Sequence, residues 1–166
     1  MNETYKVNFH CHSVFSDGEL SPENLAANLA AASVRYAALT DHDSIDGLSA
    51  FQQVFNRRGG STINGVELTT WYEGREIHLL GYGFDAHNPQ LEATLVSIRQ
   101  ITATEVHSIA GALRKKGTNN HTGATGEQNT FSASPDGRLE IEKAIALIHQ
   151  AGGIVFLAHP FQYESD

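Results

Sequence analysis

The sequence predicts an α/β fold with a mainly parallel sheet or barrel and helices outside it. Short apolar runs typical of strands alternate along the chain with longer segments of helical periodicity. Histidines and carboxylates recur at the carboxyl ends of the predicted strands, where α/β folds place their sites. The chain has 166 residues, of which 40% are hydrophobic, which is enough for one domain with a buried core.

The first half of the chain contains two predicted strand–helix pairs. The run YKVNFH at 5–10 is short and apolar, as expected of a strand. A helix is predicted at 21–34, because a serine suited to the N-cap and a proline at the first helical position precede leucines at helical spacing. The run at 36–43 predicts a second, buried strand. A helix follows at 44–60, where leucine and phenylalanine side chains share one face and glycines end the pattern.

The second half predicts three more strands and two or three helices. Strands at 61–70 and 76–85 are joined by the turn-like letters WYEGR. The segment 90–117 has the pattern of one long helix, or of two helices with a break. The segment 139–153 carries an apolar stripe at helical spacing, and the run IVFLAHP at 154–160 predicts a fifth buried strand.

One segment, 118–138, breaks the alternation of strands and helices. It is rich in Thr, Asn, Gly and Ser and has no apolar period, so we expect a flexible loop. Loops of this length are uncommon inside a compact domain and are usually functional or disordered. No internal repeat is found, and residues 1–166 are interpreted as a single domain.

Charge and composition narrow the classes of function. A formal net charge of -8 argues against a nucleic-acid groove built from a basic surface, but it leaves room for a small phosphorylated substrate. Cys11 is the single cysteine, so no internal disulfide framework exists, which suits a reducing compartment. No stretch has the length of a signal-peptide core or a transmembrane helix, and we expect a soluble cytoplasmic protein with no membrane partner.

Five of the nine histidines fall in or at the carboxyl ends of predicted strands, and the other four fall in loops or helices. The strand-associated group is His10, His12, His42, His78 and His159; the others are His87, His107, His121 and His149. Carboxylates fall at equivalent places: Asp17, Asp41, Asp43 and Glu67. Imidazole and carboxylate without thiolate are ligands typical of zinc, iron or manganese. At least seven potential ligands are present, which favours a cluster of two or three ions.

Each of these residues also has an ordinary structural interpretation. The His-x-His pair projects two imidazoles from one face of a strand, and such a pair requires compensation when buried. Glu67 is also suited to capping a turn, and Asp17 precedes a glycine as turn residues do. Asp41 is suited to orienting a ligand histidine by accepting its second N–H. Cys11 alternates away from the two histidines and is expected on the opposite face.

The chain resembles the PHP (polymerase and histidinol phosphatase) superfamily, most closely its small stand-alone nucleotide phosphoesterases. The resemblance rests on HCHSVFSDGELSPENL, ALTDHDSIDGL, GVELTT, EIHLLGYGFD and GGIVFLAHP, which occur in that order over most of 7–160. It implies a distorted barrel of seven parallel-type strands with three metals at its carboxyl rim. It also implies hydrolysis of phosphate esters by a metal-bound hydroxide, so that no protein nucleophile is required.

The resemblance also implies a role for each candidate residue. His10, His12 and Glu67 would bind the first metal, and Glu67 would bridge to a second metal bound by His78 and His159. Asp17 and His42 would bind the third. Asp41 and Asp43 would support these ligands without binding metal themselves. Arg99 is the candidate for holding substrate phosphate, with Lys115 and Lys116 nearby.

The chain departs from the family pattern in two places. It stops at FQYESD, before two further strand–helix units and a Gly-Ser-Asp-x-His-type motif, and the loop at 118–138 replaces a helical insertion. We therefore expect a partial or compact barrel with an open sheet edge. Three explanations stay open: a fragment of a longer chain, completion of the sheet by a partner or second copy, and an edge covered by the chain's own loops.

These observations lead to two hypotheses of function. The first is a metal-dependent phosphoesterase that hydrolyses small phosphorylated compounds, in particular nucleotides. The alternative is a non-catalytic metal- or ligand-binding remnant that needs further chain or a partner for activity. A nucleic-acid exonuclease is a weaker third hypothesis, because the acidic balance offers little to a long phosphate backbone.

Overall fold

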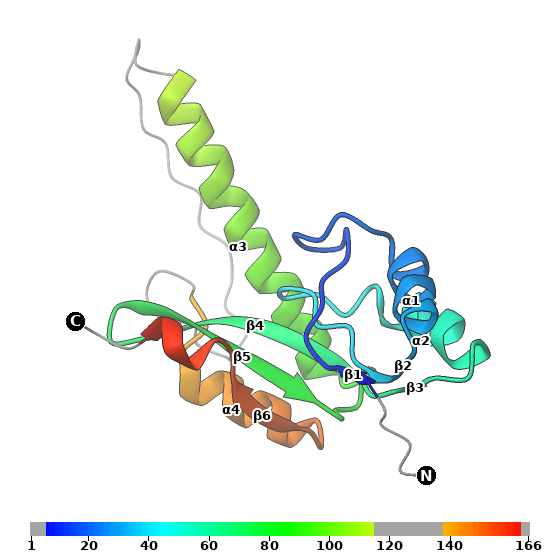
Figure 1. Cartoon of the computed structure of the whole chain (residues 1–166). Helices are drawn as coiled ribbons and strands as arrows, with labels where there is room; N and C mark the ends of the chain where they lie inside the picture. Colours follow the sequence, from blue (N-terminus) through cyan, green and yellow to red (C-terminus); the bar gives the residue numbers. More distant parts are fainter. Residues whose placement is uncertain (1–5, 115–137, 164–166) are drawn as a thin grey trace.

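The computed structural model describes residues 6–114 and 138–163, with side chains described up to residue 101 and again from residue 138. Strands and helices alternate through most of the chain (Figure 1). The elements are β1 (Lys6–Asn8), α1 (Pro22–Ala31), β2 (Val34–Ala37), α2 (Leu48–Arg57), β3 (Ser61–Thr62), β4 (Gly65–Tyr72), β5 (Arg75–Tyr82), α3 (Pro89–Arg114), α4 (Ile141–Gln150), β6 (Ile154–Leu157) and the short 3-10 helix η1 (Pro160–Tyr163).

The predicted helical segments are present, and α1, α2 and α4 are shorter than their sequence patterns. Helix α1 starts as predicted, because the Ser21 side chain accepts a hydrogen bond from the backbone N–H of Asn24 at 3.3 Å and Pro22 occupies the first turn. The segment 90–117 forms one helix, α3, as far as Arg114. The predicted loop at 118–138 lies outside the described residues except for Arg138.

The strands form two three-stranded sheets that meet at one point. β1, β2 and β3 pair in parallel, and β4, β5 and β6 pair antiparallel. Beyond β2 the chain continues alongside β4, where His42 and Glu67 form a parallel bridge. The same segment also follows β1, because the Thr40 N–H donates to the Cys11 carbonyl at 2.9 Å. The two sheets are thus joined through the residues that follow β2.

The prediction of mainly parallel strands is wrong for β5, which runs antiparallel to both β4 and β6. Residues Tyr72 and Arg75 are partners in the β4–β5 ladder, so only Glu73 and Gly74 form the turn. Both residues have positive φ, 49° and 79°, as the tight turns of hairpins require. A two-residue connection can join only antiparallel strands. The predicted strand at 61–70 is likewise two strands, β3 and β4.

Helices cover the sheets around one main core (Figure 1). Helices α1 and α2 lie beside β1–β3, and α4 contacts β4, β5 and β6. In α2, the rings of Phe51 and Phe55 are fully buried and stacked, with centroids 5.7 Å apart. The first turns of α3 bury Leu91 and Leu95, and the rest of this 26-residue helix extends away from the sheets. Among the described helices, none is both long and apolar enough to cross a bilayer.

Strand β6 is not the buried strand that its apolar letters predict. Ile154, Phe156 and Leu157 are 56%, 55% and 46% exposed. The reason is its position: within the described residues β6 pairs only with β5, so it forms an edge of its sheet. An apolar edge strand is a place where another strand can pair.

The α2 core makes a test of the fold possible. Phe51→Ala should lower the free energy of unfolding by about 3–5 kcal/mol, because it removes a fully buried aromatic ring and leaves a cavity. Gln53→Ala, an exposed position on the same helix, should change it by less than about 0.5 kcal/mol. Urea denaturation measures both values, and equal midpoints for the two variants would contradict this account of the core.

Candidate metal centre

The centre is built around the carboxylate of Glu67, which has 0% exposure. Glu67 lies in β4 where the two sheets meet. Its backbone N–H donates to the Asp41 carbonyl at 3.2 Å, and its carbonyl accepts from the Asp43 N–H at 2.8 Å. On the other side β4 pairs with β5, where Leu80 is its partner. Strand pairing on both sides therefore fixes the direction of the side chain.

Five imidazoles surround this carboxylate, and they are the five that the sequence places at strand ends. Around the ring the centroids of neighbours lie 5.1 Å apart for His10–His12, 4.8 Å for His12–His42, 4.8 Å for His42–His78, 6.2 Å for His78–His159 and 4.9 Å for His159–His10. The prediction that these side chains share one rim is confirmed. The reversal of β5 does not prevent this, because a residue near the start of β5 lies opposite the end of β4.

The two oxygens of Glu67 face different histidines. Oε2 lies 2.7 Å from His10 Nε2, 3.1 Å from His12 Nε2 and 3.6 Å from His42 Nε2. Oε1 lies 3.2 Å from both His78 Nδ1 and His159 Nε2. Each Glu67 oxygen thus faces its own group of histidines, and the bridging of two ions by this carboxylate stays a prediction.

Oε1 is a buried polar atom without a hydrogen bond, although two ring nitrogens lie 3.2 Å away. Their geometry does not suit hydrogen bonds, and a buried carboxylate oxygen without a partner is costly. A cation would satisfy the oxygen and both nitrogens together. The donor set of imidazoles and carboxylates also suits zinc, iron or manganese. The residues present thus fit a divalent metal centre.

Among the described residues, two groups of three ligand atoms are compact enough to bind an ion, with all atoms of a group within 4.8 Å of one another. These groups are His10, Glu67 and His159, and His12, His42 and Glu67. They divide the residues differently from the grouping implied by the family resemblance, which pairs His10 with His12. The contacts of the two Glu67 oxygens agree better with the implied grouping, because Oε2 faces His10 and His12 whereas Oε1 faces His78 and His159. The assignment of residues to individual ions stays a prediction.

Asp17 is the most exposed member of the predicted ligand set. Its side chain is 68% exposed, with Oδ1 3.2 Å from His12 Nδ1 and Oδ2 3.9 Å from His42 Nε2. The loop between His12 and Asp17 brings it there. Gly18 makes this loop possible, because a Cβ at this position would lie 2.2 Å from the His12 carbonyl oxygen.

Asp41 holds this loop in place. Its buried carboxylate accepts hydrogen bonds from the Ser13 N–H at 2.5 Å, the Ser13 hydroxyl at 2.7 Å and the Ser16 hydroxyl at 2.8 Å. The expectation was that Asp41 accepts an N–H from a ligand histidine. The structure directs its oxygens to the loop instead, and Ser16 Oγ lies 3.5 Å from His12 Nδ1. Asp41 thus acts on His12 through the loop.

Two residues of the centre have unusual backbone conformations. Asp43 and His159 have φ values of 50° and 46°, in the left-handed region that non-glycine residues rarely adopt. The Asp43 carboxylate accepts the backbone N–H of Thr69 at 2.9 Å, and Thr69 is the ladder partner of His78. Burial raises the pKa of Asp43 to about 6. Asp43 thus contacts the strand beside His78, and its role in supporting metal ligands stays a prediction.

The charges of the centre depend on one another. Burial raises the pKa of the Glu67 carboxyl, but the imidazoles of His12, His78 and His10 outweigh burial and hold that pKa well below its ordinary range. Glu67 in turn raises the pKa of His78. Burial lowers the pKa of His42, which favours the neutral ring that binds metal. The centre thus holds an ionised carboxylate among imidazoles.

Cys11 takes no part in the centre, as predicted. Its Sγ donates to the Ala38 carbonyl at 3.3 Å, on the side packed against the core. Burial, with the nearby Asp41 charge, raises the pKa of this thiol to about 12. It therefore remains a thiol at neutral pH.

Arg99, the candidate for holding phosphate, is engaged with neighbouring side chains. Its Nη1 donates to Ser44 Oγ at 2.9 Å and to Asp46 Oδ2 at 2.8 Å. Ser44 follows Asp43 directly, so Arg99 lies against the segment that leaves the centre. Its role in binding phosphate stays a prediction. Lys115 and Lys116 lie outside the described residues.

The remaining histidines separate as expected where they are described. His87 lies in the exposed loop before α3, and His149 lies in the last turn of α4. Neither contacts the five imidazoles that surround Glu67. The side chains of His107 and His121 lie outside the described residues.

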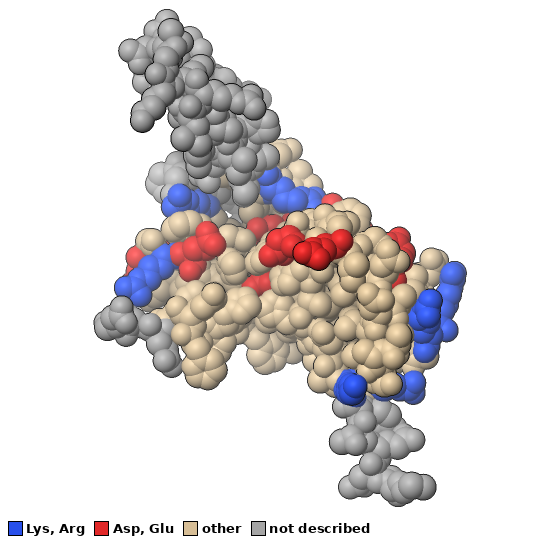
Figure 2. Space-filling view, turned by 45° about the horizontal axis from the view of Figure 1, so that its top comes forward, with Lys and Arg blue, Asp and Glu red and all other residues tan. Residues whose placement is uncertain are grey.

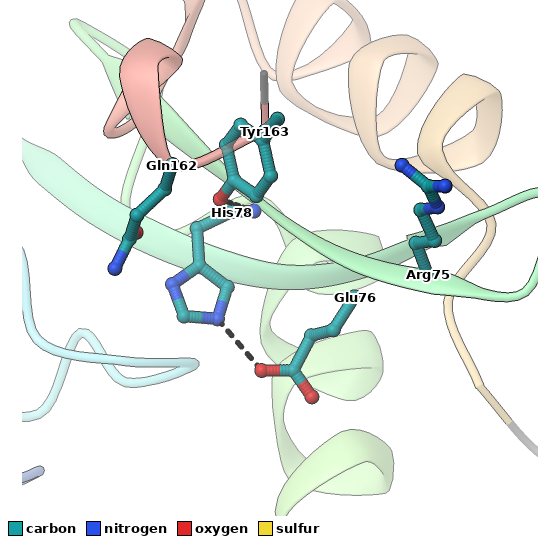
Figure 3. A pocket seen from close by; sticks show the side chains of 5 residues that line it. All are labelled: Arg75, Glu76, His78, Gln162 and Tyr163. Carbon is teal, nitrogen blue, oxygen red and sulfur yellow. Dashed lines mark hydrogen bonds and ion pairs between the residues drawn. The ribbon is translucent and has the colours of Figure 1, made fainter. Parts of the chain in front are cut away.

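Among the residues that sequence reasoning missed is Glu76, whose side chain contacts a histidine of the centre. Glu76 precedes His78 by two positions on β5, and its Oε1 lies 3.0 Å from His78 Nε2 (Figure 3). The signal was present, because residues two apart on a strand share one face. Beside them is a cavity of about 440 Å³, lined by Arg75, Glu76, His78, Gln162 and Tyr163.

A family model matches the part of the chain that contains most of this centre. The family model for the PHP domain matches residues 8–151, which include every residue of the imidazole ring except His159. The chain belongs to the PHP domain family. The family resemblance found in the sequence is confirmed.

Two relatives and one solved structure align with most of this chain. A 5'-3' exoribonuclease of Haemophilus influenzae is 34% identical over 96% of this chain and 70% of its own length. A 3',5'-nucleoside bisphosphate phosphatase of Chromobacterium violaceum is 34% identical over 67% of this chain and 39% of its own length. A solved structure from Chromobacterium violaceum, described as an amidohydrolase with bound sulfate and no metal, superposes with a TM-score of 0.80 at 25% identity, over 97% of this chain and 69% of that one.

The PHP relatives are longer than this chain. Two further relatives, 5'-3' exoribonucleases of Salmonella typhimurium and Escherichia coli, are each covered over 65% of their length. The alignment with the Haemophilus influenzae protein spans 193 positions, more than the 166 residues of this chain. That relative therefore contains residues inside the matched region that have no counterpart here.

The arrangement of the centre predicts how metal content responds to mutation. His10→Ala should weaken metal binding by at least roughly 10- to 100-fold, the cost of losing even a group that only supports a ligand, because His10 Nε2 makes the shortest contact with Glu67. Elemental analysis of the dialysed chain measures the bound metal. His87→Ala, which removes an exposed histidine away from the centre, is the matched control. Unchanged metal content in His10→Ala would remove His10 from the ligand set.

Proposed function

We propose that this chain is a metal-dependent hydrolase of phosphate esters that binds two or three divalent ions of manganese, zinc or iron and acts on small phosphorylated compounds, in particular nucleotides. The observation that carries the proposal is the ring of five imidazoles around a fully buried carboxylate with an unpartnered oxygen. Membership of the PHP family supports it, as do the phosphatase and exoribonuclease names of relatives.

The chemistry supplied by such ions is polarisation of the phosphoryl oxygens and activation of water at neutral pH. The chain's own residues hold positions. Glu67, fixed by strand pairing on both sides, keeps a negative charge at the middle of the ring. The histidines converge on it from separate segments, so a phosphoryl group bound there meets a rigid site. Rigid positioning is the main contribution a protein makes to phosphoryl transfer.

Within the described part of the chain, the side chains near the centre that could attack phosphorus have other roles. The Cys11 thiol points into the core side and has a pKa raised to about 12. The hydroxyls of Ser13 and Ser16 donate to Asp41. Water is therefore the nucleophile that the proposal requires.

The cavity beside His78 offers room for the organic part of a substrate. Its volume of about 440 Å³ lies in the range of small-molecule sites, and Tyr163 and Gln162 offer a ring and an amide to a nucleoside. Figure 2 shows Asp and Glu side chains across the middle of one face, with Lys and Arg toward its margins. Together with the net charge of -8, this favours a small substrate over a long phosphate backbone.

Removal of nucleotides from the 5' end of RNA is a second candidate function. The observation in its favour is the coverage of this chain by the exoribonuclease of Haemophilus influenzae, 34% identical over 96% of the chain. Cleavage of a terminal phosphodiester requires the same polarisation and water attack. It also requires a surface that binds the rest of the strand, which the acidic balance does not favour.

The decisive assay is release of phosphate from a nucleoside 3',5'-bisphosphate, beside cleavage of a short RNA, with manganese, zinc or iron added to the metal-free chain. Glu67→Gln should lower turnover by at least roughly 100-fold, because it removes the charge that both groups of ligand atoms share. Glu73→Gln removes an equal charge at the hairpin turn and should leave turnover unchanged.

The outcomes separate the candidates. Turnover of the bisphosphate without cleavage of RNA supports the first proposal, and rapid cleavage of RNA from its 5' end favours the second. Metal binding without turnover of either substrate would support the alternative of a non-catalytic metal-binding protein. Equal turnover of wild type and Glu67→Gln would contradict the proposed centre.

A further inference from the structure

His78 is held between two carboxylates that face its two ring nitrogens. Nδ1 lies 3.2 Å from Glu67 Oε1 at the buried centre, and Nε2 lies 3.0 Å from Glu76 Oε1 at the cavity (Figure 3). Only the second contact has the geometry of a hydrogen bond, since Glu67 Oε1 has no hydrogen-bond partner. The two nitrogens thus have different roles.

We infer that Glu76 is a positioning residue that makes His78 present Nδ1 to the metal centre. An ionised carboxylate accepts hydrogen bonds and donates none, so the bond to Glu76 requires a hydrogen on Nε2. In the neutral ring, Nδ1 then keeps a lone pair directed at the space that it shares with Glu67 Oε1. A histidine that binds metal commonly donates its other N–H to such a partner, which fixes both the tautomer and the ring orientation.

The position of Glu76 follows from the hairpin. Glu76 and His78 lie on one face of β5, where their ladder partners on β4 are Trp71 and Thr69. Figure 3 shows the Glu76 carboxylate directed toward the His78 ring, whereas Arg75 points to the other side of the strand. The Glu76 side chain is half exposed, so the pair adds little to stability. Its effect is on ring orientation.

The backbone of His78 is fixed by a second contact. The Tyr163 hydroxyl accepts the His78 backbone N–H at 2.9 Å, and the His78 carbonyl accepts the Ala158 N–H at 3.0 Å. Strand β6 ends at Leu157, so the hydroxyl takes the place of a further ladder partner. Tyr163 ends the short helix that follows His159. The segment after β6 therefore supplies one candidate ligand, His159, and fixes the backbone of a second candidate ligand, His78.

This inference rests on the proposed metal centre, and its test separates the two. The chain is freed of metal and titrated with Zn²⁺ by calorimetry, as wild type, Glu76→Gln and Glu73→Gln. Glu76→Gln should bind one ion about 10- to 100-fold more weakly, which is the usual cost of losing a partner of a ligand histidine. Its affinity for the other ions should be unchanged. Glu73→Gln, an equal loss of charge on the same hairpin, should match wild type.

A spectroscopic measurement gives a readout that a merely structural role would not change. Long-range ¹H–¹⁵N spectra of the zinc-loaded and metal-free chains report which nitrogen of His78 carries hydrogen. In wild type, Nε2 should carry hydrogen and Nδ1 should bind zinc. In Glu76→Gln the metal-free ring should populate both tautomers. Tyr163→Phe should keep the wild-type tautomer and speed exchange of the His78 amide, since it removes only the backbone contact.

Each outcome decides between the two claims. A wild-type chain that binds no zinc overturns the proposed centre, and the tautomer in the metal-free chain still decides the role of Glu76. Binding of zinc with equal affinity and the same His78 tautomer in wild type and Glu76→Gln overturns the inference alone. Coordination of zinc through Nε2 of His78 also overturns it.

Discussion

The structure depends on a carboxylate that has no exposed surface. An isolated ionised carboxylate is costly to bury, and a carboxyl in that position usually takes up a proton or finds partners. Five imidazoles surround the Glu67 carboxylate, and these histidines hold its pKa low. Those histidines come from four separate segments of the chain, since His10 and His12 belong to one of them, so distant parts of the fold meet around the charge of Glu67.

The place of Glu67 in the sheets explains why it can serve as the common point. β4 has a parallel neighbour on one side, the segment after β2, and an antiparallel neighbour, β5, on the other. The parallel side brings His42 together with the loop that Asp41 anchors, and the antiparallel side brings His78 with Glu76. In a purely parallel sheet, only the carboxyl ends of strands reach the rim. The β4–β5 hairpin also brings the first half of β5 there, and so Glu76 and His78 enter the site.

Most of the centre could be predicted from the sequence, because its residues follow simple rules of position. The His-x-His pair, Glu67 and the strand-end histidines were identified from strand periodicity and from the family motifs. The strand–helix alternation of the sequence does not predict the antiparallel direction of β5. The short turn-like letters WYEGR do indicate it, because so short a connection joins antiparallel strands. The exposure of β6 could not be predicted, since apolar letters do not show whether a strand has one neighbour or two. The role of Asp41 depends on loop hydrogen bonds that no periodicity encodes.

The ring of imidazoles joins the two ends of the described chain. His10 follows the first strand and His159 follows the last, and their rings lie 4.9 Å apart. By contrast, Glu67 and His78 belong to one hairpin with a two-residue turn, a unit whose contacts can form within microseconds. An ion shared by His10, Glu67 and His159 would therefore close a loop of nearly the full chain length, in the manner of a cross-link. Metal would then link the two sheets, and its release would remove that link.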